Sequence, residues 1–575
     1  MPSHDFYSCY HLLPTTRHIM EEFSGDRLNR LTGMLKRRGV LLPAFEIHGG
    51  VAGLYDYGPV GGRIRNKVNQ SWLNHWLTLG NIVEISSPTI TPYSVLDASG
   101  HVGEFSDYII QCNDCEEASR ADHLVEDVYP NADSFSFEKL TKVISELKPI
   151  CPACGSSSWG NIKSQNLMFS TNIGNGLSGR KGFLRPETAQ GMFTSFTSIY
   201  RHFRERLPFG AVQVGKGYRN EISPRQGMIR LREFNMAELE YFIDPAVNYE
   251  HDFSIWEDKF TLISEDEGEI DLTLKDAVQT GIIKHPTVGY FMGMTFDFVR
   301  EIGINPIHIR FRQHESNEMA HYALDCWDLE VFGSFGWVEC VGLAHRGCYD
   351  LEAHEKATGE RLRSWRSFDK PKIVNIDGWT IDSSTVGPTF KSLAGNIKEE
   401  IEKLSAESTF PMDLVIDGNA VTIEEKHVKR IQIEQKISGE WFIPHVVEPA
   451  FGIDRLIWHA LDHSYTETEK SGEDYTILSL PKAISSIDVT ILPLFEKDGI
   501  DTLAKKLHIT LCKNRNLVAN YDGSGSIGRR YARADEIGVP YCLTVDYDSL
   551  NDNTVTIRDR DTGNQKRVKI EDLEF

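Results

Sequence analysis

Residues 218–242, Y-R-N-E-I-S-P-R-Q-G-M-I-R-L-R-E-F-N-M-A-E-L-E-Y-F, constrain the fold more than any other stretch of this chain. Two extended runs flank a Ser-Pro and a Gly, which predicts a β-hairpin, and side chains along a strand alternate between its two faces. One face of the second run is apolar and is predicted to be core, whereas the other mixes charges with an aromatic ring. The apolar face carries Ile229, Leu231, Ala237, Leu239 and Tyr241, the mixed face carries Arg230, Arg232, Phe234, Met236, Glu238 and Glu240, and Arg219 and Glu221 share a face of the first run.

The mixed face has the groups that bind a purine nucleotide. Arginine forks bind phosphate oxygens, a phenylalanine ring stacks on a flat heterocycle, and a glutamate accepts from an exocyclic amine. The glycine-rich segment 48–62 matches neither phosphate-loop signature and predicts tight turns. The alternative is a solvated strand face with weak surface ion pairs. For a hairpin without further support, this alternative would be the favoured interpretation.

Four of the ten cysteines form two pairs, Cys112-x-x-Cys115 and Cys151-x-x-Cys154. Each pair can present two thiolates to one metal, so the spacing predicts a tetrahedral structural Zn²⁺ site. Such a site has no open position for catalysis. A redox pair or a chance spacing is the alternative.

The composition of the 575-residue chain, 40% hydrophobic and 25% charged, is that of a soluble globular protein. It contains no run of about 18 apolar residues and no secretory signal pattern, so we expect a cytoplasmic protein without a membrane segment. The net charge of −22 argues against a generally basic nucleic-acid-binding surface but leaves room for a local one.

Composition and turn signals divide the chain into four parts. We expect an irregular arm over 1–25, a large domain over 26–465, a linker over 466–477 and a compact α/β domain over 478–575. Within the large domain we expect insertions at 106–165, which contains the paired cysteines, and at about 243–320 and 353–440.

Three stretches resemble the three signatures of class II aminoacyl-tRNA synthetases, in the family's order. Segment 82–92 predicts a strand that ends at Pro92 and resembles the first signature. Arg219-Asn220-Glu221 with Arg232-Glu233-Phe234 resembles the second, and V-E-P-A-F-G-I-D-R, residues 447–455, resembles the third.

Five further stretches are similar to glycyl-tRNA synthetases of the dimeric archaeal and eukaryotic type, and this resemblance runs from about residue 26 to the end. They are A-S-G-H-V-G-E-F (98–105), S-R-A-D-H-L (119–124), F-L-R-P-E-T-A-Q-G-M-F (183–193), N-E-M-A-H-Y-A (317–323) and G-S-G-S-I-G-R-R-Y-A-R-A-D-E-I-G (523–538).

The resemblance implies an α+β fold, in which helices flank the antiparallel sheet of a class II catalytic domain, followed by an anticodon-binding domain. It implies that ATP activates glycine to glycyl-adenylate and that the glycyl group passes to the 3′ end of tRNA(Gly). Arg219, Glu221 and Arg455 would be catalytic, and Glu339 would help to hold Mg²⁺ with ATP. The implied ATP-binding residues are Arg219, Asn220, Glu221, Ile229, Arg230, Leu231, Arg232, Glu233, Phe234, Glu339, Cys340, Gly452, Ile453, Asp454 and Arg455.

Glycine has no side chain to grip, so its selection must rest on excluding larger residues. The resemblance implies a pocket of Arg120, Glu187, Phe234, Asn235, Met236, Ala237, Glu238, Glu448, Pro449, Ala450, Phe451 and Gly452. Ala450 stands where the family usually has serine, which removes one hydroxyl and predicts weaker glycine binding. Tyr218 and Gln165 are two milder departures from the family pattern.

The resemblance also implies tRNA contacts from Arg529, Arg530 and Arg533, and an α2 homodimer built on the first signature. Without it, these arginines could equally pair internally with acidic neighbours. Two other functions compete: a class II synthetase for another amino acid such as threonine or proline, and a synthetase-like binding module that has lost activation. The intact nucleotide residues disfavour the second.

Overall fold

The computed structural model describes residues 23–575 except 24, 130, 133–134, 177–178, 223, 225–226, 316–322, 471 and 515–516. The chain forms two compact units, residues 363–443 and the remainder. Nearly all of the predicted N-terminal arm, and the motif at 317–323 apart from Ala323, lie outside the described residues. No helix within the described ranges is both long and apolar enough to cross a membrane.

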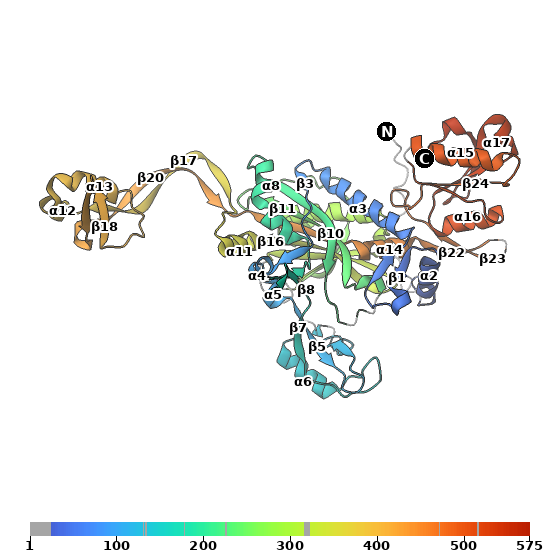
Figure 1. Cartoon of the computed structure of the whole chain (residues 1–575), viewed down its shortest axis with the longest axis horizontal. Coiled ribbons are helices and arrows are strands. Elements are labelled where there is room, and N and C mark those ends of the chain that lie inside the picture. The colour runs from blue at the N-terminus through green and yellow to red at the C-terminus, as the bar shows by residue number, and fades with distance from the viewer. Residues whose placement is uncertain are drawn as a thin grey trace. The chain divides into compact units, whose positions relative to one another are not determined.

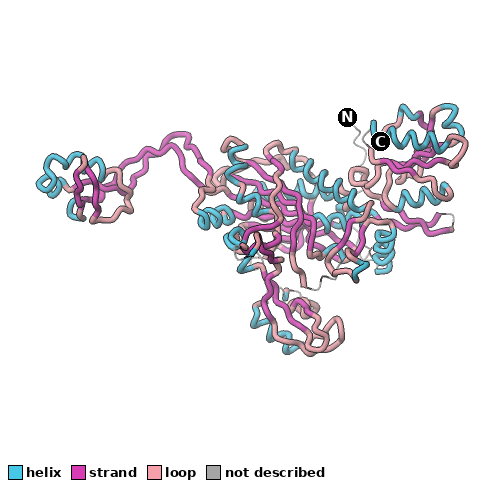
Figure 2. The backbone as a smooth tube through the Cα atoms, viewed as in Figure 1, coloured by secondary structure: helices cyan, strands magenta, loops and turns pink. Residues whose placement is uncertain are grey.

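A nine-stranded, mostly antiparallel sheet forms the centre of the larger unit (Figures 1 and 2). Only the pairs β3–β10 and β12–β14 are parallel. In spatial order its strands are β13 (Gly268–Leu272), β12 (Phe260–Ser264), β14 (Ile309–Gln313), β15 (Asp325–Gly333), β16 (Gly336–Gly347), β21 (His445–Gly452), β11 (Glu233–Ile243), β10 (Phe209–Tyr218) and β3 (Ile82–Glu84).

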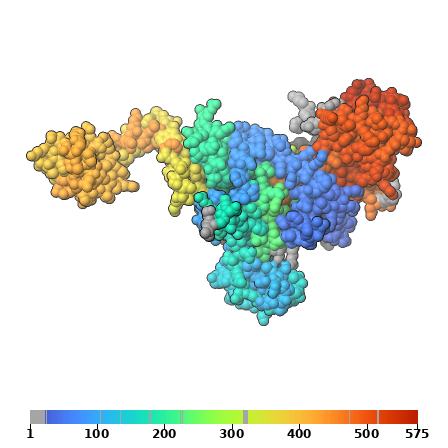
Figure 3. All heavy atoms as spheres, in the orientation of Figure 1, coloured from blue at the N-terminus to red at the C-terminus, as the bar shows by residue number. Residues whose placement is uncertain are grey.

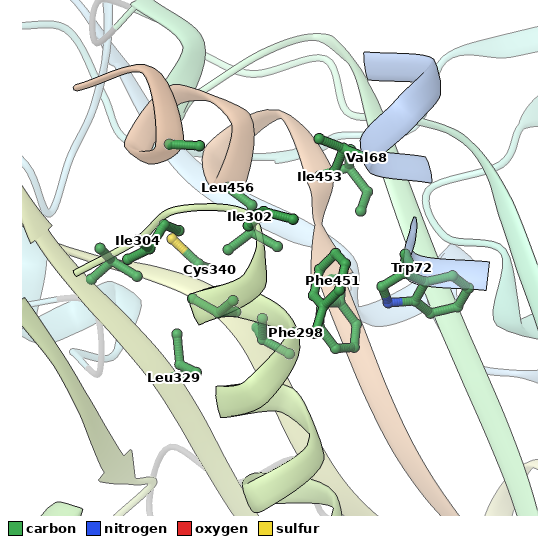
Figure 4. Packing of buried hydrophobic residues seen from close by; sticks show 14 of the residues in the cluster. Val68, Trp72, Phe298, Ile302, Ile304, Leu329, Cys340, Phe451, Ile453 and Leu456 are labelled. Atoms are coloured by element: carbon green, nitrogen blue, oxygen red, sulfur yellow. The ribbon is translucent and has the colours of Figure 1, made fainter. Parts of the chain in front are cut away.

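One face of this sheet packs on amphipathic helices to form the main core. Figure 4 shows Trp72 of α3 and Phe298 of α10 beside Phe451 of β21, and the two ring pairs meet edge-on at 5.5 and 5.7 Å. On the other face, Phe193 of α7 and Phe196 of α8 contact the Phe242 ring of β11 at 6.4 and 5.1 Å. The main helices are α2 (Gly25–Arg37), α3 (Gly61–Leu77), α9 (Leu274–Gln279), α10 (Pro286–Glu301) and α14 (Ile453–Ser464), and the others are α4 (Tyr93–Ala98), α5 (His101–Glu104), α7 (Ala189–Thr194), α8 (Phe196–His202) and α11 (Tyr349–Thr358).

The predicted hairpin is present as β10 and β11, and its alternation is as expected: Ala237, Leu239 and Tyr241 belong to the main core. Its second strand, however, begins at Glu233, so residues 229–232 are not extended as predicted. The ladder closes where Arg219 N–H donates to the Arg232 carbonyl at 3.0 Å. Beyond it Arg232 N–H turns to the carbonyl of Gly53 at 2.8 Å, and the short helix η4 (Gly227–Ile229) fills the loop.

Two further predictions differ from the structure. Segment 82–92 is not one strand: β3 joins the main sheet, whereas β4 (Ile90–Pro92) joins a separate sheet with β9 (Arg180–Leu184) and β8 (Ser170–Ile173). Pro88 lies between them and cannot donate to a ladder. The predicted insertion at 243–320 is instead built into the main sheet, because it supplies β12, β13 and β14 and the core helix α10.

The paired cysteines lie in a small lobe, residues 106–166, which we call the zinc-knuckle lobe. Its three strands are β5 (Ser106–Gln111), β6 (Ala118–Arg120) and β7 (Lys163–Asn166), and α6 (Phe137–Leu147) packs on them. The lobe has its own small core, which includes Ile110 and Leu140. The strands β1 (Leu41–Pro43) and β2 (Tyr55–Tyr57) form another small sheet near the start of the chain.

The smaller unit is a two-stranded ribbon with a separate hydrophobic cluster. Its ribbon strands are β17 (Ser364–Ile381) and β20 (Val428–Phe442), and the cluster is built on α12 (Ser383–Phe390), α13 (Ala394–Ile401), β18 (Met412–Ile416) and β19 (Asn419–Ile423).

The predicted linker over 466–477 is instead a β-hairpin of β22 (Tyr465–Lys470) and β23 (Glu473–Leu478). Gly472, directly before β23, takes a φ of +80°, a conformation that favours glycine. The C-terminal domain follows as one compact body, red in Figure 3, with its own core. Its sheet runs β25 (Ala519–Tyr521), β24 (Val489–Pro493), β26 (Tyr541–Val545), β27 (Thr554–Asp559) and β28 (Gln565–Lys569), with helices α15 (Ile500–Asn514), α16 (Ile527–Glu536) and α17 (Tyr547–Asp552).

Candidate active site

A cavity of about 190 Å³ opens on the polar face of the main sheet, over β11, β16 and β21. The loop between β10 and β11 and the start of α14 complete its wall. Sixteen predicted site residues line it: Arg219, Glu221, Ile229, Arg230, Leu231, Phe234, Asn235, Met236, Glu238, Glu339, Cys340, Ala450, Phe451, Gly452, Asp454 and Arg455. The structure therefore brings the second- and third-signature residues together.

Two lining residues, Met228 and Gly342, were not predicted from the sequence. Gly342 is the register partner of Ala450 and lies two positions after Cys340. The same period-two rule that separated the faces of β11 could have found it. Met228 carries no such signal, because it lies in the η4 turn rather than on a strand.

At one end of the cavity, cationic groups surround an aromatic ring. The Arg219 guanidinium lies 5.5 Å from the Phe234 ring centroid, and its Nε has no hydrogen-bond partner within the described part of the chain. Gly217 faces Phe234 across the hairpin, where a Cβ would lie 2.5 Å from the ring. Arg455, which also lines the cavity, donates to the carbonyls of Glu339 at 2.6 Å and Ile229 at 3.1 Å. This end suits a flat ring with attached phosphates.

Asp454 joins this end of the site to the sheet. Its carboxylate accepts from the backbone N–H of Asn235 at 2.6 Å, from the Asn235 side chain at 2.9 Å and from the Tyr57 hydroxyl. Asp454 is buried, so these donors replace the water it has lost. The start of α14, and with it Arg455, is thereby fixed against β11.

The opposite end of the site is built from carboxylates. Glu238 lines the cavity and accepts from Thr188 N–H at 2.7 Å and from its hydroxyl. Burial, then the charges of Glu448 and Glu187, raise the pKa of Glu238 to about 8. Burial would also raise the pKa of Glu187, but His101 at 3.3 Å and Arg346 outweigh it and hold that pKa below its usual range.

Arg346 organises the layer behind Glu238. It donates to Asp350 at 2.9 Å and to Glu448 at 2.6 Å, and all three groups are buried. Glu187 and Glu448, both predicted glycine ligands, thus lie in this layer rather than on the cavity wall, and Glu187 borders a neighbouring cavity. Such a network is costly to break, because removing one partner leaves an uncompensated buried charge.

The remaining predicted residues lie elsewhere. Ala237 and Ile453 belong to the main core, and Pro449, Asn220 and Glu233 do not line the cavity. The side chain of Glu233 pairs with Lys216, and that of Arg232 donates to the carbonyls of Ala52 at 2.7 Å and Glu221 at 3.2 Å.

Arg120 does not reach the glycine end. Its guanidinium forks onto Asp122 at 2.5 and 3.1 Å and lies 3.1 Å from Asp107, so it is occupied within the zinc-knuckle lobe. A direct contact between Arg120 and the substrate does not fit this placement.

The four paired cysteines converge on one point. The Sγ atoms of Cys112 and Cys154 are 3.7 Å apart, and so are those of Cys115 and Cys151. A tetrahedral Zn²⁺ with Zn–S bonds of about 2.3 Å has S···S edges of about 3.8 Å, so the donor set fits this metal.

His314, Cys326 and Asp328 also cluster. Here the imidazole Nε2 lies 2.8 Å from Asp328, and the Arg312 guanidinium lies 3.3 Å from the same carboxylate. This arrangement is a hydrogen-bonded ion pair rather than a metal site.

The three C-terminal arginines have different surroundings. Arg530 is buried and donates to the carbonyls of Pro493 and Gly525, which disfavours it as a phosphate contact. Arg533 is paired with Asp522 at 2.6 and 2.9 Å. Arg529 is exposed on α16 and stays a candidate tRNA contact.

Comparison with known proteins agrees with this geometry. The family model described as tRNA synthetase class II core domain (G, H, P, S and T) matches residues 177–326, and that of the anticodon binding domain matches 488–574. A solved structure, Giardia lamblia prolyl-tRNA synthetase in complex with prolyl-adenylate, shares the fold with a TM-score of 0.50 at 14% identity, over 95% of this chain and 74% of that one. The fold is that of a class II aminoacyl-tRNA synthetase.

Curated relatives show to which family within this class the chain is similar. The glycine--tRNA ligase of Methanocaldococcus jannaschii is 43% identical over 95% of this chain and 98% of its own length. Those of Methanothrix thermoacetophila and Archaeoglobus fulgidus are 41% identical, over 95% of this chain and 96% and 95% of their lengths. The chain belongs to the glycine--tRNA ligase family. The predicted α+β class II fold and the family resemblance are confirmed.

Proposed function

We propose that this chain is a ligase that joins glycine to tRNA(Gly) in two steps. A glycine carboxylate oxygen attacks the α-phosphorus of ATP, the bond to pyrophosphate breaks, and glycyl-adenylate forms. A terminal ribose hydroxyl of tRNA(Gly) then takes the glycyl group and AMP leaves. One observation carries the proposal: a single cavity has cations around an aromatic ring at one end and a buried carboxylate at the other, in a chain that matches these relatives over nearly its whole length.

The first step needs positioning and charge neutralisation more than acid–base catalysis, because the attacking carboxylate is already ionised. We assign Arg219 to the α-phosphate, Phe234 to the adenine face and Glu221 to the adenine amine. Arg455 covers the opposite ring face and reaches toward the γ-phosphate. Its carbonyl contacts fix the guanidinium before ATP arrives.

Mg²⁺ fits beside Glu339, whose side chain is 55% exposed. Bound there with ATP, the ion would neutralise phosphate charge. At the other end, Glu238 receives the glycine ammonium, and Glu187 and Glu448 support it from behind. The fit of the four cysteines to tetrahedral geometry supports structural Zn²⁺ in the zinc-knuckle lobe.

We further propose a homodimer that works in the cytoplasm, where its tRNA partner is found. The exposed apolar Ile90 on β4, in the first-signature region, supports an interface there, and two-fold pairing is the commonest assembly. Sedimentation equilibrium would distinguish a dimer of twice 65.2 kDa from a monomer.

The decisive experiment is ATP–pyrophosphate exchange with each amino acid in turn, without tRNA. Exchange with glycine alone is expected, and Arg219→Ala should abolish it. Exchange with threonine, proline or another amino acid would assign the pocket to a different substrate. A folded protein that gives no exchange with any amino acid would be a binding module, and the proposal would be wrong.

A further inference from the structure

Arg230 is a cavity residue that also contacts the zinc-knuckle lobe. It follows η4 and lines the cavity, and its Nε lies 3.8 Å from Glu221. Its Nη1 lies 3.2 Å from Nε2 and 3.4 Å from Nδ1 of His123, an imidazole of the zinc-knuckle lobe. The lobe therefore touches the nucleotide end of the cavity through this ring.

The segment that carries His123 is firmly anchored. It follows β6, where the Arg120 fork holds Asp122 at 2.5 and 3.1 Å. The flanking Ala121 and Val125 are buried in the core of the lobe. The imidazole is thus held from both sides along the chain, and Arg120, which does not line the cavity, gains a role as its anchor.

Burial and the neighbouring arginines favour the neutral form of this imidazole. Burial, then Arg120 and Arg230, lower the pKa of His123 to about 4, against the opposing charge of Asp122. A neutral imidazole can accept from a guanidinium without cancelling its charge. Arg230 can therefore be held in place while its positive charge stays available to a phosphate.

We propose that His123 is a positioning residue for Arg230, and that through it the zinc-knuckle lobe forms a wall of the ATP site. This inference rests on the proposed function, because the inference assigns Arg230 to the phosphates of ATP. His123 acts through Arg230 and touches no reacting atom. ATP affinity, rather than glycine affinity, is the quantity it controls.

The test compares KM values for ATP and glycine in pyrophosphate exchange. His123→Ala is expected to raise the KM for ATP about tenfold, the size of one hydrogen bond to a charged group. The KM for glycine should stay within about twofold, because the carboxylate end is untouched. His123→Gln keeps a neutral acceptor and should restore most of the ATP affinity. His123→Glu should not, because a carboxylate would neutralise Arg230.

Two controls separate positioning from simple loss of structure. Leu124→Ala removes partly buried packing in the same turn but leaves the imidazole, and it should not change the KM for ATP. In an Arg230→Gln background, His123→Ala should have no further effect. Unchanged ATP affinity in His123→Ala, equal losses for ATP and glycine, or an equal defect in Leu124→Ala would overturn the inference. The wild-type exchange reaction tests the proposed function separately.

Discussion

The pKa of Glu238 predicts how glycine affinity depends on pH. The glycine ammonium needs an ionised acceptor, but burial raises the pKa of Glu238 to about 8. About a tenth of this carboxyl is then ionised at pH 7.0 and about three quarters at pH 8.5. The KM for glycine should therefore fall about eightfold between these values in pyrophosphate exchange, while the KM for ATP changes little.

Two variants test whether Glu238 causes this pH dependence of the KM for glycine. Glu238→Gln cannot ionise and should show a high KM for glycine without the pH dependence. Ala450→Ser adds a hydroxyl on the register partner of Glu238. A donor to the ionised form lowers its pKa, so this variant should reach tight glycine binding at lower pH. A wild-type KM for glycine that is flat from pH 7.0 to 8.5 would refute the assignment.

The same shift has a consequence for stability. The pKa of Glu238 is higher in the folded protein than the ordinary glutamate value of 4.5, so the folded state binds more protons. Its contribution to stability is present below pH 4.5 and is lost as the pH rises toward 8. Glu238→Gln should therefore melt above wild type at pH 8.5, and the difference should narrow as the pH falls toward 4.5.

Three further changes test other parts of the fold. The buried Arg558 donates to Asp535 at 2.8 and 2.9 Å, so Asp535→Asn leaves an uncompensated buried charge. This change should lower the free energy of unfolding in urea by about 3–5 kcal/mol. Cys151→Ser should lower the zinc content measured by elemental analysis and make the zinc-knuckle lobe sensitive to protease. Gly215→Ala places a Cβ 2.1 Å from a guanidinium nitrogen of Arg185 and should lower the free energy of unfolding by about 1–3 kcal/mol. Gly62→Ala in α3 places its Cβ 3.9 Å from the nearest atom, the Tyr57 carbonyl oxygen, and should not destabilise the protein.

The sequence predicted the strands best where both faces carried a signal. On β11 the alternation of Ala237 and Leu239 with Glu238 correctly separated core from cavity, because the pleat leaves each side chain only one face. The alternation gave a wrong prediction at 229–232, where hydrogen bonds to the 48–62 segment replace the strand pairing of the hairpin. The alternation of side chains along one strand carries no information about a hydrogen-bond partner that is distant in sequence.

The site shows the same division. The residues that line the cavity follow from the signatures, but the occupation of Arg120 by Asp107 and Asp122 does not. Nor does the contact between His123 and Arg230, which joins residues 107 positions apart. Charged side chains pair according to which carboxylates the fold brings near, and the linear sequence does not contain that proximity.

Glu187 and Glu238 have opposite pKa shifts, and the difference follows from their partners. Glu187 has His101 and Arg346 as cationic partners, whereas the nearest donors to Glu238 come from the neutral Thr188. The raised pKa of Glu238 favours its protonated form at neutral pH, which relieves its repulsion with Glu448. Under the proposed function, the glycine ammonium would replace that proton rather than add to an ionised site.

This exchange predicts that glycine binding releases close to one proton at pH 7, because most Glu238 is protonated before binding and ionised after it. Titration calorimetry in two buffers of different ionisation enthalpy measures the number directly. Release should fall toward zero at pH 9, where the carboxyl is already ionised, and should be absent in Glu238→Gln. Proton uptake, or release that does not change with pH, would show that the ammonium is not received by Glu238.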